Sequence, residues 1–266
     1  MAVNAIILAA GSGSRLRPHT DDRPKGMVNL GGTCMLEHQI AVLREGGVRD
    51  IAVVGGYRAE MLRDLGVEVI LNPRWAETNM VETLFCADAR IGPDTIVAYA
   101  DIIYEPRVLT ALLASPHDVS VVIDRSWRIY WTQRFSDPLS DAETLRLDSA
   151  GRIMDIGNRP TRIEDIEAQY IGLMRFRGAG VARLRRARAA LGTSPRPWMQ
   201  VRPIEKAYMT DLLMEMVLLD LPPHAVPVER GWIEIDTVAD YDLARDALAG
   251  RVDIGFRHPA GTGAAA

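Results

Sequence analysis

Three observations predict an α/β protein with a parallel central sheet. Short apolar runs at residues 5–10, 51–54 and 67–71 alternate with stretches of helical periodicity. The first two runs are unbroken, as is typical of strands that are covered on both faces. Crossovers between such strands are right-handed and join parallel neighbours. Glycines follow the first run at once, and ligands in such sheets bind beyond the carboxyl ends of the strands.

The remaining elements follow in order along the chain. Apolar residues recur near helical spacing between residues 29 and 48, and Gly46-Gly47 is typical of the end of a helix. Two segments around residues 148–151 predict a β-hairpin. Further helices are expected at residues 58–65, 81–89, 180–191 and 210–220, and further strands at residues 95–104, 119–123, 169–176 and 232–236.

Composition and charge restrict the class of protein. The 266 residues, of which 48% are hydrophobic and 25% charged, can bury the core of one large domain or two small ones. The net charge of −4 offers no footprint for nucleic acid, and no apolar run is long enough to cross a bilayer. Cys34 and Cys86 lack metal-ligand spacing, so we expect two buried thiols. The polar start is unlike a signal peptide, and we expect a cytoplasmic enzyme without nucleic-acid or membrane partners.

The first thirty residues carry the strongest functional signal. Backbone N–H groups in the loop Gly11-Ser12-Gly13 can form an anion-binding nest, and Arg15 and Lys25 add positive charge. The loop matches neither the Walker A motif nor the dinucleotide fingerprint, whose third glycine would stand at Leu16. The glycines alone would equally fit a tight strand-to-helix turn. The added charges favour a triphosphate as the ligand.

The motif Leu8-Ala9-Ala10-Gly11-x-Gly13-x-Arg15-Leu16, followed by Arg23-Pro24-Lys25, resembles the signature of the sugar-nucleotidyltransferase family. The resemblance spans residues 4–248 and implies a three-layer, Rossmann-like nucleotidyltransferase fold with a mixed, mostly parallel sheet. It implies a catalytic domain at residues 1–250 with a small inserted acceptor-binding subregion at about 124–176. The Ala/Gly-rich end of the chain predicts that residues 251–266 form a disordered tail. By this resemblance Arg15 would meet the β,γ-phosphates, and Lys25 the α-phosphate and the incoming phosphate.

The loop after residue 71 has two interpretations. Thr78 and Asn79 either cap the helix that follows or reach the nucleobase, because an amide offers both a donor and an acceptor. An Asn-Pro pair followed by Thr-Asn and a helix is similar to the phosphocholine cytidylyltransferase branch, which favours cytosine. The nucleotide-binding residues are therefore expected to be Leu8, Ala9, Ala10, Gly11, Ser12, Gly13, Thr78, Asn79 and Ala100, with Arg15 and Lys25 as the catalytic pair.

Two aspartates stand where strands are predicted to end. A charge at Asp101 costs too much to bury unpaired, so it is either a turn residue or a ligand of a magnesium ion that bridges phosphate oxygens. Alternation places Glu234 and Asp236 on one side of the last strand, where like charges need a cation or solvent between them. The family resemblance implies that Asp101 and Asp236 hold Mg²⁺.

An aromatic cluster follows the strand at residues 119–123. Its three rings share one side of a predicted helix, and they form either a packing face or a cage for a quaternary ammonium group. The segment is similar to one in cytidylyltransferases for phosphocholine and aminoethylphosphonate, and nearby carboxylates could instead bind a primary ammonium. The acceptor-binding residues are expected to be Trp127, Tyr130, Trp131, Asp141, Glu143, Tyr170 and Glu234.

Together these features predict a magnesium-dependent transfer of CMP from CTP to a small phosphate or phosphonate, with release of pyrophosphate. The acceptor is expected to resemble phosphocholine or 2-aminoethylphosphonate. A uridylyl- or guanylyltransferase acting on a sugar 1-phosphate is one alternative, and a nucleotide-binding module without catalysis is another. The apolar helix at residues 210–220 is expected to pack in the core, with a homodimer face as its alternative role.

Overall fold

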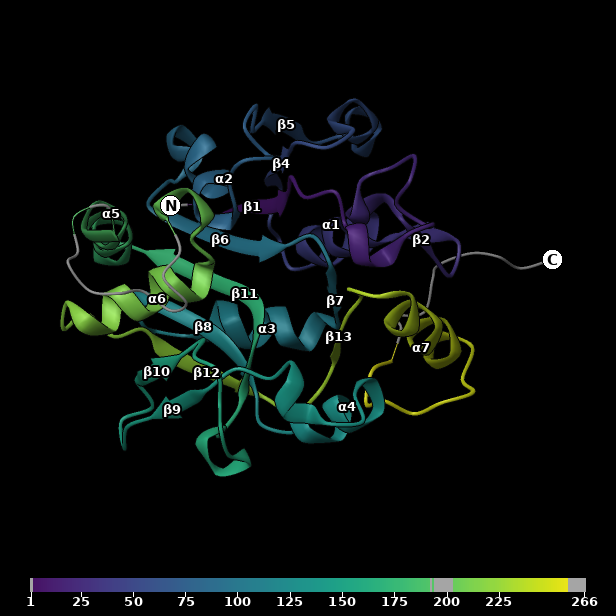
Figure 1. Cartoon of the computed structure of the whole chain (residues 1–266). Helices are drawn as coiled ribbons and strands as arrows, with labels where there is room; N and C mark the ends of the chain where they lie inside the picture. The colour runs from purple at the N-terminus through teal and green to yellow at the C-terminus, as the bar shows by residue number, and fades with distance from the viewer. Residues whose placement is uncertain (1, 192, 194–202, 258–266) are drawn as a thin grey trace.

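The computed structural model describes residues 2–191, 193 and 203–257 of the chain (Figure 1). Its centre is a seven-stranded sheet in the order β12-β8-β11-β6-β1-β4-β5. β11 runs antiparallel to its neighbours β6 and β8, and the other pairs are parallel, which confirms the predicted mixed, mostly parallel sheet. The strands are β1 Asn4–Ala9, β4 Asp50–Gly55, β5 Glu68–Leu71, β6 Asp94–Tyr99, β8 Val119–Asp124, β11 Gln169–Arg177 and β12 His224–Val228.

Helices cover both faces of the sheet and complete the predicted three layers. On one face lie α1 (Met35–Glu45) and α3 (Pro106–Ala114). On the other lie α2 (Met80–Cys86), α5 (Ala179–Leu191) and α6 (Met209–Leu218). In Figure 1, α5 and α6 are seen together on the left of the sheet.

The side chains of β1 show why its apolar run is unbroken. Ala5 and Ile7 belong to the core beneath α1 and α3, whereas Ile6 and Leu8 belong to the core beneath α2, α5 and α6. None of the four is more than 8% exposed. Successive strand residues point to opposite faces, so a strand with a helical layer on each side needs apolar residues at every position.

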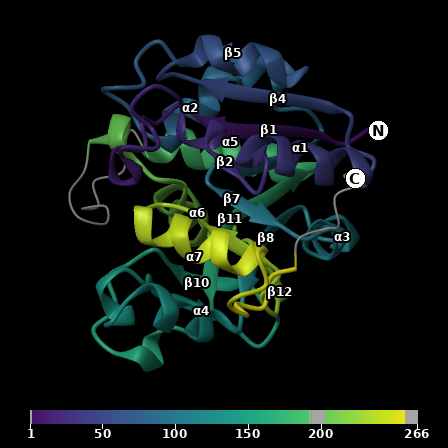
Figure 2. The ribbon, with the colours of Figure 1, turned by 90° about the vertical axis from the view of Figure 1, so that its right-hand side faces the viewer.

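Between β8 and β11 the chain leaves the sheet and forms a small subregion. It contains α4 (Trp127–Arg134) and the antiparallel pair β9 (Leu145–Leu147) and β10 (Ile153–Ile156), which is the predicted hairpin. Figure 2 shows α4 and β10 at the opposite end of the molecule from β5. The predicted subregion, residues 124–176, extends too far, because residues 169–176 belong to β11 of the central sheet.

After β12 the chain returns to the carboxyl end of β6. There β13 (Trp232–Glu234) pairs antiparallel with β7 (Ile102–Tyr104), and α7 (Val238–Leu248) follows. The single strand predicted at residues 95–104 is therefore two strands, β6 and β7, separated by a turn at residues 100–101. The turn places Asp101 at the carboxyl end of β6, which is the end of the strands where ligands are expected.

The segment predicted as a helix at residues 58–65 is a short 3₁₀ helix, η3 (Ala59–Leu65). Left-handed backbone at Arg58 and Gly66, with φ of 51° and 65°, bounds it on both sides. The other short elements are η1 Ser14–Leu16, η2 Lys25–Met27, β2 Asn29–Leu30, β3 Thr33–Cys34, η4 Asp88–Arg90, η5 Pro138–Ser140, η6 Ile163–Asp165 and η8 Ile204–Lys206.

The two cysteines differ in exposure. Cys34 is buried, as predicted, whereas the prediction for Cys86 is wrong because its side chain is exposed. α2 turns Val81 and Leu84 into the core. Cys86 lies two residues beyond Leu84, which on a helix places it away from that buried face.

The packed chain extends beyond residue 250. Ile254 and Phe256 are 0% and 7% exposed, so the folded part includes residues that were expected in the tail. The end of that predicted tail, residues 258–266, lies outside the described residues. In the described part of the chain, no helix is long and apolar enough to cross a membrane.

Candidate active site

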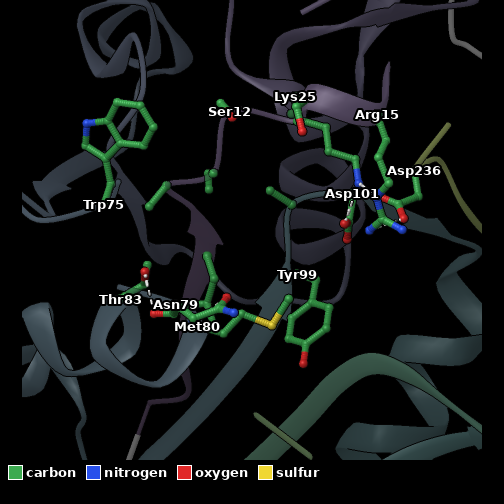
Figure 3. A pocket seen from close by; sticks show the side chains of 18 of the residues that line it. Ser12, Arg15, Lys25, Trp75, Asn79, Met80, Thr83, Tyr99, Asp101 and Asp236 are labelled. Carbon is green, nitrogen blue, oxygen red and sulfur yellow. Dashed lines mark hydrogen bonds and ion pairs between the residues drawn. The ribbon is translucent and has the colours of Figure 1, made fainter. Parts of the chain in front are cut away.

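Four charged side chains meet beyond the carboxyl end of β6, as Figure 3 shows. The Nζ of Lys25 donates hydrogen bonds to Oδ2 of Asp101 at 2.7 Å and to Oδ1 of Asp236 at 2.6 Å. Arg15 forms an ion pair with the same Asp236. The sequence predicts these four residues as a catalytic pair and a metal-binding pair, and the structure brings all of them together.

Strand pairing and loop geometry explain this meeting. β13 pairs with β7, and the N–H of Ile235 donates to the carbonyl oxygen of Asp101 at 2.9 Å, which places Asp236 beside Asp101. Gly13 in the glycine loop has a φ of 63°, and a Cβ at that position would lie 2.9 Å from Cβ of Lys25. Glycine therefore lets the loop adopt this conformation and approach Lys25 closely.

The Lys25 side chain is charged in this arrangement. It is 13% exposed, and burial by itself acts to lower the pKa of Lys25. The charges of Asp101 and Asp236, and their hydrogen bonds to the ammonium, outweigh burial and raise that pKa above its usual value. The ammonium thus stands as a cation between two carboxylates.

A cavity of about 270 Å³ opens in front of these charges. In Figure 3 the charged groups stand at one end of it, and Trp75, Asn79 and Thr83 stand at the other. The cavity is lined by every residue predicted to bind the nucleotide, namely Leu8, Ala9, Ala10, Gly11, Ser12, Gly13, Thr78, Asn79 and Ala100.

The uncharged end of this cavity is built around the start of α2. Asn79 accepts a hydrogen bond from the N–H of Met80 at 2.9 Å, as the capping interpretation predicts, and it also lines the cavity. Trp75, Thr83 and Tyr99 line the cavity as well, although they were not predicted as site residues from the sequence. Trp75 could have been found as a large aromatic residue in a polar loop that follows the carboxyl end of a strand.

A second cavity, also of about 270 Å³, adjoins the first. Arg15, Met80, Tyr99 and Asp236 line both cavities, so the charged cluster stands where the two meet. Of the residues predicted to bind the acceptor, the second cavity is lined by Trp131, Asp141, Glu143, Tyr170 and Glu234, but not by Trp127 or Tyr130. The second cavity is also lined by the polar residues Gln169, Tyr208 and Thr210, which were not predicted from the sequence.

The second cavity is acidic. Burial raises the pKa of Asp141, although the Arg134 charge acts in the opposite direction. Burial likewise raises the pKa of Glu234 to about 7, and Arg134 again opposes the shift. Among the described residues that line this cavity, Arg15 is the only Lys, Arg or His. The arrangement of charges therefore favours a ligand with a cationic group.

Comparison with known proteins adds the family. The model of the MobA-like NTP transferase domain matches residues 5–158, which is more than half of the chain. The chain belongs to this family. The match confirms the nucleotidyltransferase resemblance that the glycine loop, Arg15 and Lys25 indicate.

Individual proteins that are similar to this chain support the same family assignment. A CTP:phosphoglutamine cytidylyltransferase of Campylobacter jejuni is 34% identical over 252 residues, which cover 91% of this chain and 98% of the relative. A 2-aminoethylphosphonate cytidylyltransferase of Lancefieldella rimae is 31% identical over 160 residues, which cover 58% of this chain and 60% of the relative. The solved structure of a CTP:phosphocholine cytidylyltransferase from Streptococcus pneumoniae covers 93% of this chain with a TM-score of 0.68. The match includes 100% of the chain in that solved structure. At 21% sequence identity, this likeness shows the fold alone.

Two of the predicted acceptor-binding aromatics lie in the core of the transferase. Trp127 and Tyr130 are 4% and 1% exposed. The guanidinium carbon of Arg134 lies 5.2 Å from the ring centroid of Tyr130 and 5.1 Å from that of Trp131. The guanidinium carbon of Arg230 lies 4.1 Å from the Tyr130 centroid. The chain's own cations thus contact Tyr130, and the Trp127 ring packs against Trp131 with centroids 5.9 Å apart. Both observations favour the packing interpretation for Trp127 and Tyr130.

Asp101 and Asp236 fit a divalent cation by their chemistry. Oδ1 of Asp101 is buried and has no hydrogen-bond partner, and one oxygen of each carboxylate already faces the Lys25 ammonium. One or two carboxylates that act together with substrate phosphates are typical ligands of Mg²⁺. In the described part of the chain, no group of three or more His, Cys, Asp or Glu side chains is placed to hold a metal ion. The pair fits a cation that shares its other ligands with a substrate.

Proposed function

We propose that this transferase moves CMP from CTP to a small phosphate or phosphonate acceptor that carries an amine, with Mg²⁺ as its cofactor. The observation that carries the proposal is the position of the charged cluster. Arg15 and Asp236 line both cavities, with Lys25 and Asp101 beside them in the first. A nucleotide in the first cavity and an acceptor in the second would bring their phosphate groups together at this cluster.

The reaction requires positioning more than acid–base chemistry. An acceptor oxygen attacks the α-phosphorus of CTP, the bond from that phosphorus to the bridging oxygen breaks, and pyrophosphate leaves. A phosphate or phosphonate oxygen is already ionised at neutral pH, so no protein base is needed. Lys25 would neutralise charge on the α-phosphate, and Arg15 would neutralise charge on the leaving pyrophosphate. Mg²⁺ held by Asp101 and Asp236 would supply further charge neutralisation on the phosphate oxygens.

The choice of CTP is supported by relatives and by the chemistry of the uncharged end. The Campylobacter and Lancefieldella relatives are both named as cytidylyltransferases. Asn79 offers an amide, which can both donate to and accept from a pyrimidine edge. Trp75 lines the same end and presents an aromatic ring of the kind on which bases stack.

The amine on the acceptor is supported by the charge of the second cavity. Asp141, Glu143 and Glu234 line it, and a carboxylate that meets an ammonium forms a charge-assisted hydrogen bond. Such a bond is worth about 1.5–3 kcal/mol, which corresponds to about a tenfold to 150-fold preference over an acceptor without the amine.

The test is a screen for pyrophosphate release by the wild-type protein. Four ribonucleoside triphosphates are each combined with phosphocholine, 2-aminoethylphosphonate, phosphoglutamine and glucose 1-phosphate, with Mg²⁺ or with EDTA. The matched control acceptor is 2-hydroxyethylphosphonate, in which a hydroxyl replaces the amine. We expect CTP with an amine-bearing acceptor to react fastest, and only with the metal. Preference for UTP or GTP with the sugar phosphate would overturn the proposal, as would tight CTP binding without pyrophosphate across the whole panel.

A further inference from the structure

The buried guanidinium of Arg134 joins the inserted subregion to the segment that carries Glu234 and Asp236. Arg134 is the last residue of α4, and its side chain is 1% exposed. Its Nη1 donates to Oε2 of Glu234 at 2.7 Å, while its Nε and Nη2 donate to the two carboxylate oxygens of Asp240 at 2.8 Å and 3.2 Å. Two parallel hydrogen bonds to one carboxylate define the orientation of both groups.

Asp240 in turn holds the backbone at Asp236. Its Oδ2 accepts hydrogen bonds from the N–H of Asp236 at 3.1 Å and from the N–H of Thr237 at 2.9 Å. The N–H of Asp240 donates back to Oγ1 of Thr237 at 3.2 Å, which caps the start of α7. Because the Asp236 carboxylate bonds to Lys25, a continuous set of contacts runs from Arg134 to the charged cluster.

Two aromatic residues of α4, and Phe135 directly after it, lie around this guanidinium. The ring centroids of Tyr130, Trp131 and Phe135 lie 5.2, 5.1 and 4.9 Å from Cζ of Arg134. The Tyr130 hydroxyl donates to the carbonyl oxygen of Glu234 at 2.9 Å and accepts from the N–H of Glu234 at 3.1 Å. A buried charge is stable only when it is well paired, and the planar fork of arginine offers the two-point contact that lysine lacks.

We propose that Arg134 is a positioning residue of this transferase. It orients Glu234 at the second cavity, which we propose binds the acceptor, and Asp236 at the charged cluster of Arg15, Lys25, Asp101 and Asp236. It thereby couples the inserted subregion to the reacting phosphates. Arg134 itself lines neither cavity, so it acts through these two carboxylates and Asp240. The inference rests on the proposed function for its kinetic readout, and amide hydrogen exchange supplies a readout that needs no activity.

The variants are Arg134→Met and Arg134→Lys, compared with the matched controls Arg175→Met and Arg175→Lys. Arg175 is also buried, at 7% exposed, and forms the same two-point contact with Asp94, with both distances 2.7 Å. Asp94 begins β6, whereas the charged cluster lies beyond the other end of that strand. Thermal unfolding of all four variants identifies any that fail to fold.

Hydrogen exchange of the segment 233–241 tests the contact directly. Loss of the ion pair between Arg134 and Asp240 should release the amides of Asp236 and Thr237, because the guanidinium then no longer holds the Asp240 carboxylate in place. We expect exchange in this segment to accelerate at least about tenfold in Arg134→Met, less in Arg134→Lys, and not in the Arg175 variants, since one decade corresponds to about 1.4 kcal/mol of local stability. Unchanged exchange in Arg134→Met would overturn the proposal whatever the activity.

Kinetics test the consequence. A displacement of about 1 Å can cost about a hundredfold in rate, so kcat of Arg134→Met should fall about tenfold to a hundredfold and the acceptor KM should rise. The dissociation constant of CTP should change less than the acceptor KM, because Asp236 is the only one of the three carboxylates that lines the nucleotide cavity. Equal losses in the Arg134 and Arg175 variants would refute positioning in favour of a structural role. If the wild-type protein transfers nothing but exchange responds as expected, the proposed function fails and the positioning role stands.

Discussion

Replacing Lys25 by Met should strengthen metal binding while it strongly lowers turnover. In the structure the Lys25 ammonium stands between Asp101 and Asp236, so a divalent cation must compete with it for the same oxygens. The substitution keeps an unbranched side chain of similar length and removes the competing charge. It also removes the group that we assign to the α-phosphate.

The size of the effect follows from the two hydrogen bonds, which measure 2.7 Å and 2.6 Å. A hydrogen bond to a charged group contributes about 1.5–3 kcal/mol, so the pair contributes about 3–6 kcal/mol. If the displaced ammonium recovers half of this in water, the competition costs about 1.5–3 kcal/mol, or about a tenfold to 150-fold loss of metal affinity. Lys25→Met should bind the metal more tightly by that factor.

Calorimetric titration of the nucleotide-free protein with Mn²⁺ measures this affinity, and Mn²⁺ should also raise the Tm of the variant more than that of the wild type. The control is Arg186→Met, which removes one exposed positive charge on α5. Turnover of Lys25→Met should fall about a hundredfold or more, as for loss of a donor to developing charge. Equal Mn²⁺ affinities in variant and wild type would refute the competition. Turnover within a few-fold of wild type would refute the role of Lys25 in the reaction.

The remaining predictions concern single side chains. Asp101→Asn keeps the size of the side chain but removes its charge, and pyrophosphate release should fall about a hundredfold or more; near-normal release would show that Asp101 is only a turn residue. Trp127→Ala should lower the free energy of unfolding in urea by about 3–5 kcal/mol, because the ring is buried, and leave the acceptor KM unchanged. A several-fold rise in that KM would instead support the aromatic cage. Arg230→Met leaves Asp124, which is 0% exposed, without the guanidinium that donates to it at 2.7 Å. The free energy of unfolding should therefore fall by about 3–5 kcal/mol, and a loss below about 1 kcal/mol would contradict the importance of this buried pair.

Much of the fold and one end of the site could be predicted because their signals are local. The apolar run at residues 5–10 must be a strand covered on both faces, and the glycines that follow must turn the chain at its end. Arg15 and Lys25 follow closely in the sequence, so a short loop is enough to place them near that end. Asp101 was predicted for the same reason, since it follows an apolar strand directly.

Helical periodicity showed that Trp127, Tyr130 and Trp131 share one side of a helix, but not what that side would face. The answer depends on two arginines, because burial of the Arg134 and Arg230 charges requires carboxylate partners and is aided by aromatic faces. These partners come from distant parts of the chain, where periodicity carries no information. For Cys86 the signal was local, since its helical spacing from Val81 and Leu84 indicates that it faces solvent.

The sequence by itself determined the α/β class, the glycine loop and the identity of the four charged residues. The tertiary structure decided how they meet. Pairing of β13 with β7 places Asp236 beside Asp101, and the Lys25 ammonium then stands between the two carboxylates. Pairing of strands so far apart in the chain depends on which edges and faces remain unburied once the rest has folded. Local residue patterns specify a strand, but packing of the whole domain selects its partner.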